Sequence, residues 1–281
     1  MFCIKGFNNV GNTCYLNAGS QLLIQNKDFC KVVLKNEDKF EDLSKLINEY
    51  YNSNNKNSIT PFAIKNMAGS KYKRFKGNDQ QDAQDLMNTL MDILNEKTND
   101  EFNSLFQIQS KITNKCKLTT CLNTSTIIDK NNFLILPIKK EFTDLNDCYR
   151  EYKIHEKLED DDMFFCEKCN DKRIASRKLE VASWPKHLIV FLKRFNNNLK
   201  KIDNIIEVPI NWRHGYVIKG AVIQTGSLNG GHYTYVSRIL ETDGTIGWRY
   251  CDDSNVGPID ESKAQMFLNR SYIIYYEKQD E

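Results

Sequence analysis

Residues 6–21 read GFNNVGNTCYLNAGSQ and place a cysteine, Cys14, where a turn gives way to a helix. The glycine and asparagines before it suit a tight turn, and the apolar residues after it begin a helical pattern. At a helix N-terminus, the dipole and the unpaired backbone N–H groups favour the thiolate, so we expect a pKa below about 8.5. A buried structural cysteine fits the position equally well, so the partners of Cys14 must decide its role.

The pattern of the chain changes near residue 105. Before that point it is helical, in stretches beginning at Cys14 and spanning 40–51 and 78–97, the last with Asn78 or Asp79 as a possible N-cap. After it, strand-like segments cover 125–138, 179–195, 205–210, 216–225, 232–240, 247–253 and 271–278. Asn229-Gly230-Gly231 and Asp243-Gly244 are typical of hairpin turns. A helical half before an antiparallel sheet half predicts an α+β fold, with a site between the halves.

Composition narrows the class of protein. The 281 residues suffice for one large domain or two modest ones, and the formal net charge of +2 argues against a dedicated nucleic-acid binder. No apolar run approaches the roughly 20 residues of a membrane span, and no signal peptide is evident. Nine scattered cysteines are typical of a reducing compartment, so we expect a cytoplasmic or nuclear location.

A thiolate that transfers acyl groups needs a base, and His232 is the best candidate. It follows a glycine pair at the start of a strand, in NGGHYTYV at 229–236. The next strand ends in Asp252 and Asp253, so paired strands can bring a carboxylate to the imidazole; a simple turn signal is the alternative. The other histidines favour surface or structural roles: His155, His187 and His214.

Five motifs in one order add a family resemblance. They are GNTCYLNA at 11–18, QQDAQD at 80–85, LKRF at 192–195, GGHYTYV at 230–236 and YCDDSNV at 250–256. Together they closely resemble the ubiquitin-specific proteases, papain-like cysteine deubiquitinases, from about Gly6 to Tyr276. Any one motif would be weak, whereas five in the right order are specific.

The resemblance implies a single catalytic domain over 1–281 with the shape of a hand. A helical thumb is expected over about 1–105, fingers over about 106–180 and a palm over about 181–281, the last two built on antiparallel sheet. It also implies hydrolysis of the isopeptide or peptide bond after the C-terminal glycine of ubiquitin.

The resemblance assigns the catalytic roles residue by residue. Cys14 attacks the carbonyl, His232 acts as base and then acid, and Asp252 orients His232. Asn9 donates its side-chain amide to the oxyanion, a contribution worth about 3–4 kcal/mol in the barrier. Asp253 adds polar stabilisation.

Substrate contacts are implied around QQDAQD. Gln81 and Asp82 belong to a match with the family's glutamine-glutamine-aspartate box, which alanine, histidine and glutamate usually follow; here Gln84 and Asp85 replace that histidine and glutamate. Asp82 and Asp85 are three residues apart, so they share a helix face and can meet the arginines of the ubiquitin tail. Tyr233 matches a position that lines the channel for the glycine pair.

Four cysteines predict a metal site. Cys166 and Cys169 have the CxxC spacing of tetrahedral zinc sites, and Cys116 and Cys121 can supply the other two ligands. The family carries a structural zinc at corresponding positions at the fingertips. Here the first pair is CxxxxC, two residues longer, so a fingertip without metal is the alternative. Four thiolates leave no open position, and catalysis is expected to need no cofactor.

Three other functions stay open at this point. The chain can be a peptidase for another ubiquitin-like modifier, an inactive ubiquitin-binding module, or a zinc-dependent adaptor. The adaptor leaves the motifs around Cys14 and His232 unexplained. The expected partners are ubiquitin and ubiquitinated proteins, together with an unidentified regulatory protein, and we expect a monomer with no nucleic-acid or membrane partner.

Overall fold

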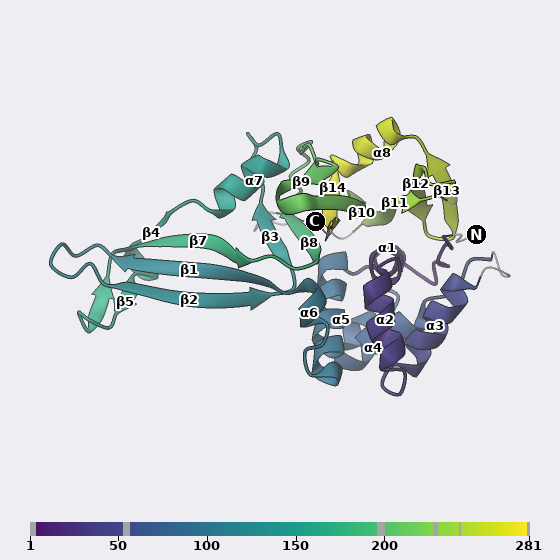
Figure 1. The fold of residues 1–281 in the computed structure, drawn as a ribbon, viewed down its shortest axis with the longest axis horizontal. Helices are drawn as coiled ribbons and strands as arrows, with labels where there is room; N and C mark the ends of the chain where they lie inside the picture. Colours follow the sequence, from purple (N-terminus) through teal and green to yellow (C-terminus); the bar gives the residue numbers. More distant parts are fainter. Residues whose placement is uncertain (1–3, 53–56, 196–199, 228–229, 242, 280–281) are drawn as a thin grey trace.

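The computed structural model describes residues 4–52, 57–195, 200–227, 230–241 and 243–279. Three parts are visible in Figure 1: a body of helices, a long β-structure that projects away from it, and a second sheet with helices of its own. We call them the thumb (α1 to α6), the fingers (β1, β2, β4 and β7) and the palm (the sheet containing β8 and β10 to β14). The α+β architecture predicted from the sequence is confirmed.

The thumb packs its helices around α1. Its elements are α1 (Cys14–Ile24), α2 (Lys27–Lys35), α3 (Glu41–Tyr51), α4 (Phe62–Lys71), the 3-10 turn η1 (Lys73–Phe75), α5 (Ala83–Thr98) and α6 (Asn103–Phe106). All residues of α1 are buried, including polar Asn17 and Gln21, because the helix lies between the palm sheet and the rest of the thumb. The N-cap of α5 is Asp82 rather than Asn78 or Asp79, so this helix begins later than its pattern predicts.

The palm is an eight-stranded sheet. Its strands run in the order β13-β12-β11-β10-β14-β8-β3, with β9 paired to β10, and only β3 with β8 is parallel. Their bounds are β3 (Leu134–Pro137), β8 (His187–Lys193), β9 (Asn211–Trp212), β10 (Tyr216–Gly226), β11 (Gly231–Leu240), β12 (Ile246–Asp252), β13 (Asn255–Ile259) and β14 (Ser271–Lys278).

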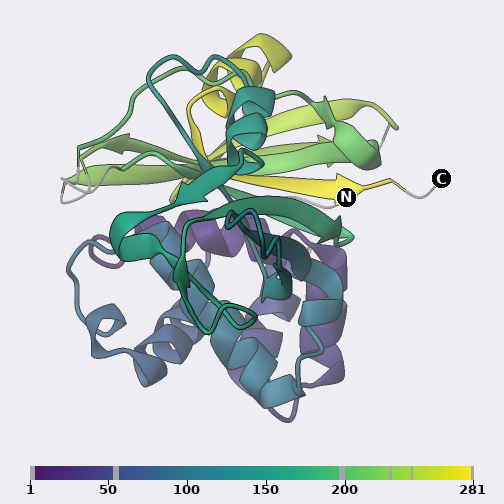
Figure 2. The ribbon, with the colours of Figure 1, turned by 90° about the vertical axis from the view of Figure 1, so that its left-hand side faces the viewer.

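Both faces of the palm sheet are buried. Ile189 and Phe191 of β8 join the core shared with the thumb, whereas Leu188, Val190 and Leu192 join a second core beneath α7 (Leu145–Tyr152) and α8 (Glu261–Leu268). Figure 2 shows the sheet between these two layers of helices. A sheet covered on both sides explains the uninterrupted apolar runs of its central strands.

The fingers are thinner and more exposed than the palm. Their sheet has the order β2-β1-β7-β4, from β1 (Ile108–Cys116), β2 (Thr124–Asn131), β4 (Glu156–Leu158) and β7 (Ala175–Ser183). At the tip, β5 (Phe164–Cys166) and β6 (Asp171–Arg173) form a hairpin beyond the turn η2 (Asp160–Asp162). Between β2 and β4 the chain enters the palm to form β3 and α7, so the finger strands are not contiguous in sequence.

The strand predictions were wrong in three places. The segment 179–195 is two strands of different sheets, separated at Trp184 and Pro185, and 125–138 divides into β2 and β3. The segment 205–210 forms no strand; Pro209 has no N–H to donate, and Glu207 makes only an isolated bridge to Asp144. Helices α7 and α8 were missed because each spans only eight residues.

The turn signals had mixed outcomes. Strands β11 and β12 pair antiparallel through the turn at Asp243-Gly244, as predicted, whereas Asn229 lies outside the described residues. None of the described helices has the length and apolar character needed to cross a membrane.

The arginine of the LKRF motif, Arg194, has a structural role. The residue is 2% exposed, and its guanidinium donates to the carbonyl oxygens of Ser271 (2.6 Å) and Asn204 (2.8 Å). A buried charge is tolerated when its donors are satisfied in this way. The residue therefore ties the end of β8 to the start of β14.

Candidate active site

Cys14 is the first residue of α1 and lies against the palm. The thiol interacts with the backbone N–H of Tyr233, on β11, and the residue is 2% exposed. Burial raises the pKa of Cys14 above its ordinary value; the carboxylate of Asp253 adds to the rise, and the Tyr233 N–H opposes it. The expected lowering of this pKa was wrong, because desolvation of the thiolate outweighs the favourable backbone groups at the helix N-terminus.

His232 and Asp252 form a hydrogen-bonded pair. The imidazole Nε2 lies 2.7 Å from Asp252 Oδ1, and the two side chains are 43% and 41% exposed, so solutes can reach them. The register of β11 and β12 places both residues on the same face of the sheet. With Nε2 engaged by the carboxylate, Nδ1 is the ring nitrogen left for another partner.

The imidazole is a neighbour of the thiol but is not bound to it. His232 directly precedes Tyr233, whose backbone N–H meets the Cys14 thiol. Among the residues described, no hydrogen bond joins Cys14 to His232. Such bonds are often long in free enzymes and tighten in the substrate complex.

Asn9 is held in one orientation by the turn before α1. Its Oδ1 accepts hydrogen bonds from the backbone N–H groups of Gly11 and Thr13, both at 3.1 Å, and its Nδ2 donates to Asp253 Oδ2 at 2.8 Å. These contacts fix which end of the amide carries the N–H groups. One amide N–H is used by Asp253, and the second remains for a ligand.

Asp253 connects three segments that are distant in sequence. Besides its bond to the Asn9 amide, Oδ1 accepts from Asn17 Nδ2 on α1 (2.7 Å), and the backbone carbonyl accepts from Phe7 N (2.8 Å). Its φ of 51° is left-handed, a conformation that Asp tolerates. Asp253 thus joins the β12–β13 turn to the loop and helix that carry Asn9 and Cys14.

Asp82 is engaged inside the protein. It accepts from the backbone N–H of Gln84 (2.7 Å) as the N-cap of α5, and its carboxylate also accepts from the hydroxyls of Tyr233 (2.9 Å) and Tyr272 (3.0 Å). The carboxylate therefore anchors Tyr233 in place. The predicted contact between Asp82 and ubiquitin stays a prediction.

Asp85 is placed differently from Asp82. Its side chain is 50% exposed and pairs with Arg74 at 3.3 Å. An exposed ion pair of this kind is weak and exchanges easily for another cation. Of the two predicted acids, Asp85 is the one with a carboxylate open to a partner.

Gln80 is a residue that sequence reasoning missed. Its amide clamps the backbone of Gly231, donating from Nε2 to the carbonyl (2.5 Å) and accepting from the N–H at Oε1 (3.1 Å). Gln81, the glutamine predicted to meet substrate, makes no side-chain hydrogen bond in the described part of the chain. The doubled glutamine was the available signal. Nothing in the sequence indicated which of the two contacts the backbone of Gly231, the residue before His232.

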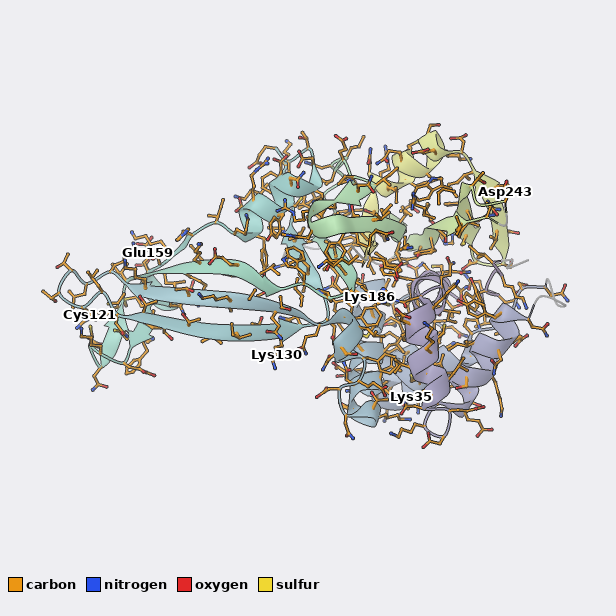
Figure 3. All side chains as sticks on the ribbon, viewed as in Figure 1. Lys35, Cys121, Lys130, Glu159, Lys186 and Asp243 are labelled. Atoms are coloured by element: carbon orange, nitrogen blue, oxygen red, sulfur yellow. The ribbon has the colours of Figure 1, made fainter. Side chains whose placement is uncertain are left out.

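The four predicted metal ligands converge at the fingertip. The Sγ atoms of Cys116, Cys121, Cys166 and Cys169 all lie within 4.8 Å of one another. Figure 3 shows Cys121 at the far end of the fingers. Cys121 and Cys166 are 3.6 Å apart, close to the roughly 3.8 Å expected between sulfurs at about 2.3 Å from a tetrahedral zinc. The longer CxxxxC spacing therefore does not prevent a four-thiol cluster.

The four thiols interact closely enough to shift one another's pKa. Hydrogen bonds from the Cys169 backbone N–H and from the thiols of Cys121 and Cys169 outweigh burial and bring the pKa of Cys166 to about 7, whereas the neighbouring thiols raise the pKa of Cys116 and of Cys169. Cys116 and Cys166 are buried at the ends of β1 and β5.

Comparison with known proteins identifies the family. The family model described as "Ubiquitin carboxyl-terminal hydrolase" matches residues 5–276. Ubiquitin carboxyl-terminal hydrolase 4 of Saccharomyces cerevisiae is 26% identical over 97% of this chain and 39% of its own length. Human ubiquitin carboxyl-terminal hydrolase 2 is 27% identical over 98% of this chain and 55% of its own length. The chain thus spans about two fifths to one half of these relatives.

Solved structures share the fold. One titled "Structure of the SAGA Ubp8/Sgf11/Sus1/Sgf73 DUB module bound to ubiquitin aldehyde" has a TM-score of 0.80 at 22% identity, over 98% of this chain and 70% of that one. A second, of a variant of the same module bound to monoubiquitin, has a TM-score of 0.78 at 24% identity, over 98% of this chain and 69% of that one. The chain belongs to the ubiquitin carboxyl-terminal hydrolase family.

Proposed function

We propose that this protein is a cysteine-type deubiquitinase that hydrolyses the isopeptide or peptide bond after the C-terminal glycine of ubiquitin. One observation carries the proposal. The buried thiol of Cys14, the His232–Asp252 pair and the Asn9 amide gather at one end of α1, from both halves of the chain. An adaptor or an inactive binding module has no use for that convergence. The names of the relatives support ubiquitin as the modifier.

In the acylation step, His232 removes the thiol proton at Nδ1 while Sγ of Cys14 bonds to the carbonyl carbon. The raised pKa of Cys14 means that the free enzyme holds a neutral thiol, so a base is required. The C–N bond then breaks, and the imidazolium returns its proton to the leaving amine. Asp252, bound to Nε2, holds the ring in the tautomer that receives the proton at Nδ1.

In the deacylation step, the thioester is hydrolysed. Water enters in place of the amine, His232 takes its proton, and the C–S bond breaks to release the ubiquitin carboxylate and the Cys14 thiol. In both steps charge develops on the carbonyl oxygen, and the second N–H of Asn9 is the donor for it. Asp253 acts through Asn9 and is a positioning residue.

Ubiquitin recognition is proposed at two places near the nucleophile. Asp85 exchanges Arg74 for an arginine of the ubiquitin tail, because its carboxylate is exposed and its ion pair is weak. Tyr233, fixed by Asp82, forms a wall beside Cys14 that favours residues without a Cβ. Both roles rest on the proposed substrate.

A structural zinc ion is proposed at Cys116, Cys121, Cys166 and Cys169. The four sulfur atoms fit a tetrahedral donor set, and a bound zinc would tie the β1–β2 turn to the β5–β6 hairpin. The ion would stabilise the fingertip and take no part in the reaction.

Ubiquitin bearing a C-terminal thiol-reactive group tests the proposed function. The wild type should be labelled at Cys14 and Cys14→Ala should not, with Cys30→Ala as a control that removes another buried thiol. Labelling that persists in Cys14→Ala would refute the assignment. Parallel probes built on other ubiquitin-like modifiers test the substrate, and preferential labelling by one of them would replace ubiquitin in the proposal.

A further inference from the structure

A groove of about 520 Å³ lies on the β12–β13 hairpin, beside the candidate active site. Its lining residues all belong to this hairpin, between Tyr250 and Ile259. Asp252 is one of them, and its carboxylate also lies 2.7 Å from Nε2 of His232. The groove therefore starts at the His232–Asp252 pair and continues along β13, the edge strand of the palm.

The strand order of the palm gives the proposed substrate a direction. Asp85, the proposed contact for the ubiquitin tail, follows Gln84, which accepts from the hydroxyl of Tyr272 on β14 (3.3 Å). Cys14 lies against β11, where its thiol meets the backbone N–H of Tyr233. Because the strands follow the order β13-β12-β11-β10-β14, Asp85 and the groove lie on opposite sides of the nucleophile.

A ubiquitin conjugate extends in two directions from the carbonyl that Cys14 attacks. With the ubiquitin tail at Asp85, the leaving amine and the protein that carries it extend across β12 and β13. Figure 1 shows these two strands at the end of the palm away from the fingers. The groove therefore lies on the leaving-group side of the cleft, an inference that rests on the proposed function.

The groove presents apolar surface and little charge. Tyr250, Pro258 and Ile259 contribute apolar atoms, and among the described residues that line the groove only Asp252 is charged. The ring of Tyr250 stacks on Phe267 of α8, with centroids 4.7 Å apart, which holds this wall in place. Such a surface favours apolar side chains, and the Asp252 carboxylate disfavours acidic ones by like-charge repulsion.

Gly257 leaves the middle of the groove open. The residue pairs with Tyr250 across the hairpin. A Cβ added at Gly257 would meet no atom within 4 Å, and the φ of the residue lies outside the left-handed region. The backbone therefore accepts a side chain here without strain, and that side chain would occupy space that is free in the groove.

We propose that this groove binds the protein segment that carries the modified lysine, and that it favours an apolar residue beside that lysine. Asp252 joins the groove to His232, which returns a proton to the leaving amine in the proposed reaction. A segment bound in the groove holds that amine within reach of the imidazole. The β12–β13 hairpin thus contributes to the choice of substrate protein.

Gly257→Leu tests the proposal, because leucine fills the groove and leaves the residues proposed for catalysis unchanged. One substrate is a ubiquitin C-terminal fluorogenic amide, whose leaving group is a small dye. The other is ubiquitin joined by an isopeptide bond to a short lysine-containing peptide. Gly257→Leu should raise KM for the peptide conjugate by at least about tenfold and hydrolyse the amide as wild type does. Gly257→Ala should have a smaller effect of the same kind.

Two results would overturn the proposal. One is hydrolysis of the peptide conjugate by Gly257→Leu at the wild-type KM and kcat. The other is an equal loss on both substrates, which would place the defect at the active site rather than in the groove. A wild type that hydrolyses neither substrate would refute the proposed function as well, so the two failures are distinguishable.

Peptide composition provides a second measurement that needs no variant. Conjugates with leucine or with glutamate on both sides of the modified lysine are compared in the wild type. The leucine conjugate should have a KM about tenfold lower, and this preference should disappear in Gly257→Leu. Equal KM values in the wild type, or a lower KM for the glutamate conjugate, would contradict an apolar leaving segment.

Discussion

The protein holds cysteines in two contrasting sites. Cys14 is a single thiol in the shared core of thumb and palm, and the groups that act on it include Tyr233 and Asp253, which are distant in sequence. The four cysteines of the fingertip lie within 54 residues of one another, in a thin sheet whose outer strand β2 is almost wholly exposed. One site is rigid because a core surrounds it, whereas the other has little core behind it. We propose the same side chain as a nucleophile in one place and as a metal ligand in the other.

The difference also appears in how each thiol is charged. Burial raises the pKa of Cys14, which is why the proposed reaction relies on His232 to remove the thiol proton. At the fingertip the four thiols act on one another: the pKa of Cys166 is lowered to about 7, whereas the pKa of Cys116 and of Cys169 is raised. The pKa of Cys14 thus depends mainly on burial in the core, and those of the fingertip thiols depend on their neighbours in the cluster.

Metal removal is expected to have the largest effect, confined to the fingertip. Structural zinc contributes about 10–16 kcal/mol in zinc-finger peptides, so a strong chelator should unfold this region. Amide hydrogen exchange should rise over 116–125 and 164–173, while a small thiol reagent still modifies Cys14. Cys166→Ser should show the raised exchange without chelator. Unchanged exchange in the chelated wild type would exclude a structural metal.

Asp252→Asn should lower the rate of catalysis at the candidate active site and leave the fingertip unchanged. The amide no longer selects the required imidazole tautomer, and kcat should fall by about 10⁴. Hydrolysis of a ubiquitin C-terminal fluorogenic substrate measures this effect. Asp243→Asn, in the exposed β11–β12 turn, is the matched control. A loss of less than about tenfold would mean that another group orients His232.

Asn9→Ala should lower kcat by about 10²–10³, with little change in KM, because a donor to the oxyanion acts mainly in the transition state. Asn8→Ala is the matched control, since its amide donates to Thr60 instead of facing Asp253. An increase in KM at constant kcat would show that Asn9 binds substrate rather than the transition state.

Gln80→Leu should lower kcat by about tenfold, because the backbone of Gly231 next to His232 loses both of its amide contacts. Gln81→Leu, the adjacent change, should affect KM instead if Gln81 meets the substrate. Steady-state kinetics of the two variants separate positioning from binding. Equal effects on both parameters in both variants would contradict this division.

The pH dependence of Cys14 alkylation should show the smallest effect. Because burial raises its pKa, the thiolate fraction is small at neutral pH and grows as pH rises. The rate of modification by iodoacetamide should rise by up to about tenfold per pH unit, with a midpoint above the ordinary value of about 8.5. A rate independent of pH between about 6 and 8 would indicate a preformed thiolate–imidazolium pair instead.

Much of the site could be read from local sequence. Cys14 before a helical pattern, His232 after a glycine pair and Asp252 at a strand end each carry a short-range signal, and strand pairing then predicts their meeting. The two CxxC-like pairs likewise predicted a cluster that the fold brings together. These features depend on spacing along one or two elements, which a sequence displays directly.

Other features depended on contacts between distant segments. Nothing near Asp253 indicated that it would hold Asn9, 244 residues away, and nothing near Gln80 indicated Gly231 as its partner. Nothing near Asp82 indicated that its carboxylate would accept hydrogen bonds from the hydroxyls of Tyr233 and Tyr272.

The sequence by itself determined the α+β class, singled out the residues proposed as nucleophile and base, and predicted the cluster of four thiols. Only the tertiary structure decided the burial that raises the pKa of Cys14 and the contacts that position Asn9. The physical reason is that hydrophobic periodicity and turn chemistry are local, whereas burial and charge clustering depend on which surfaces the folded chain brings together.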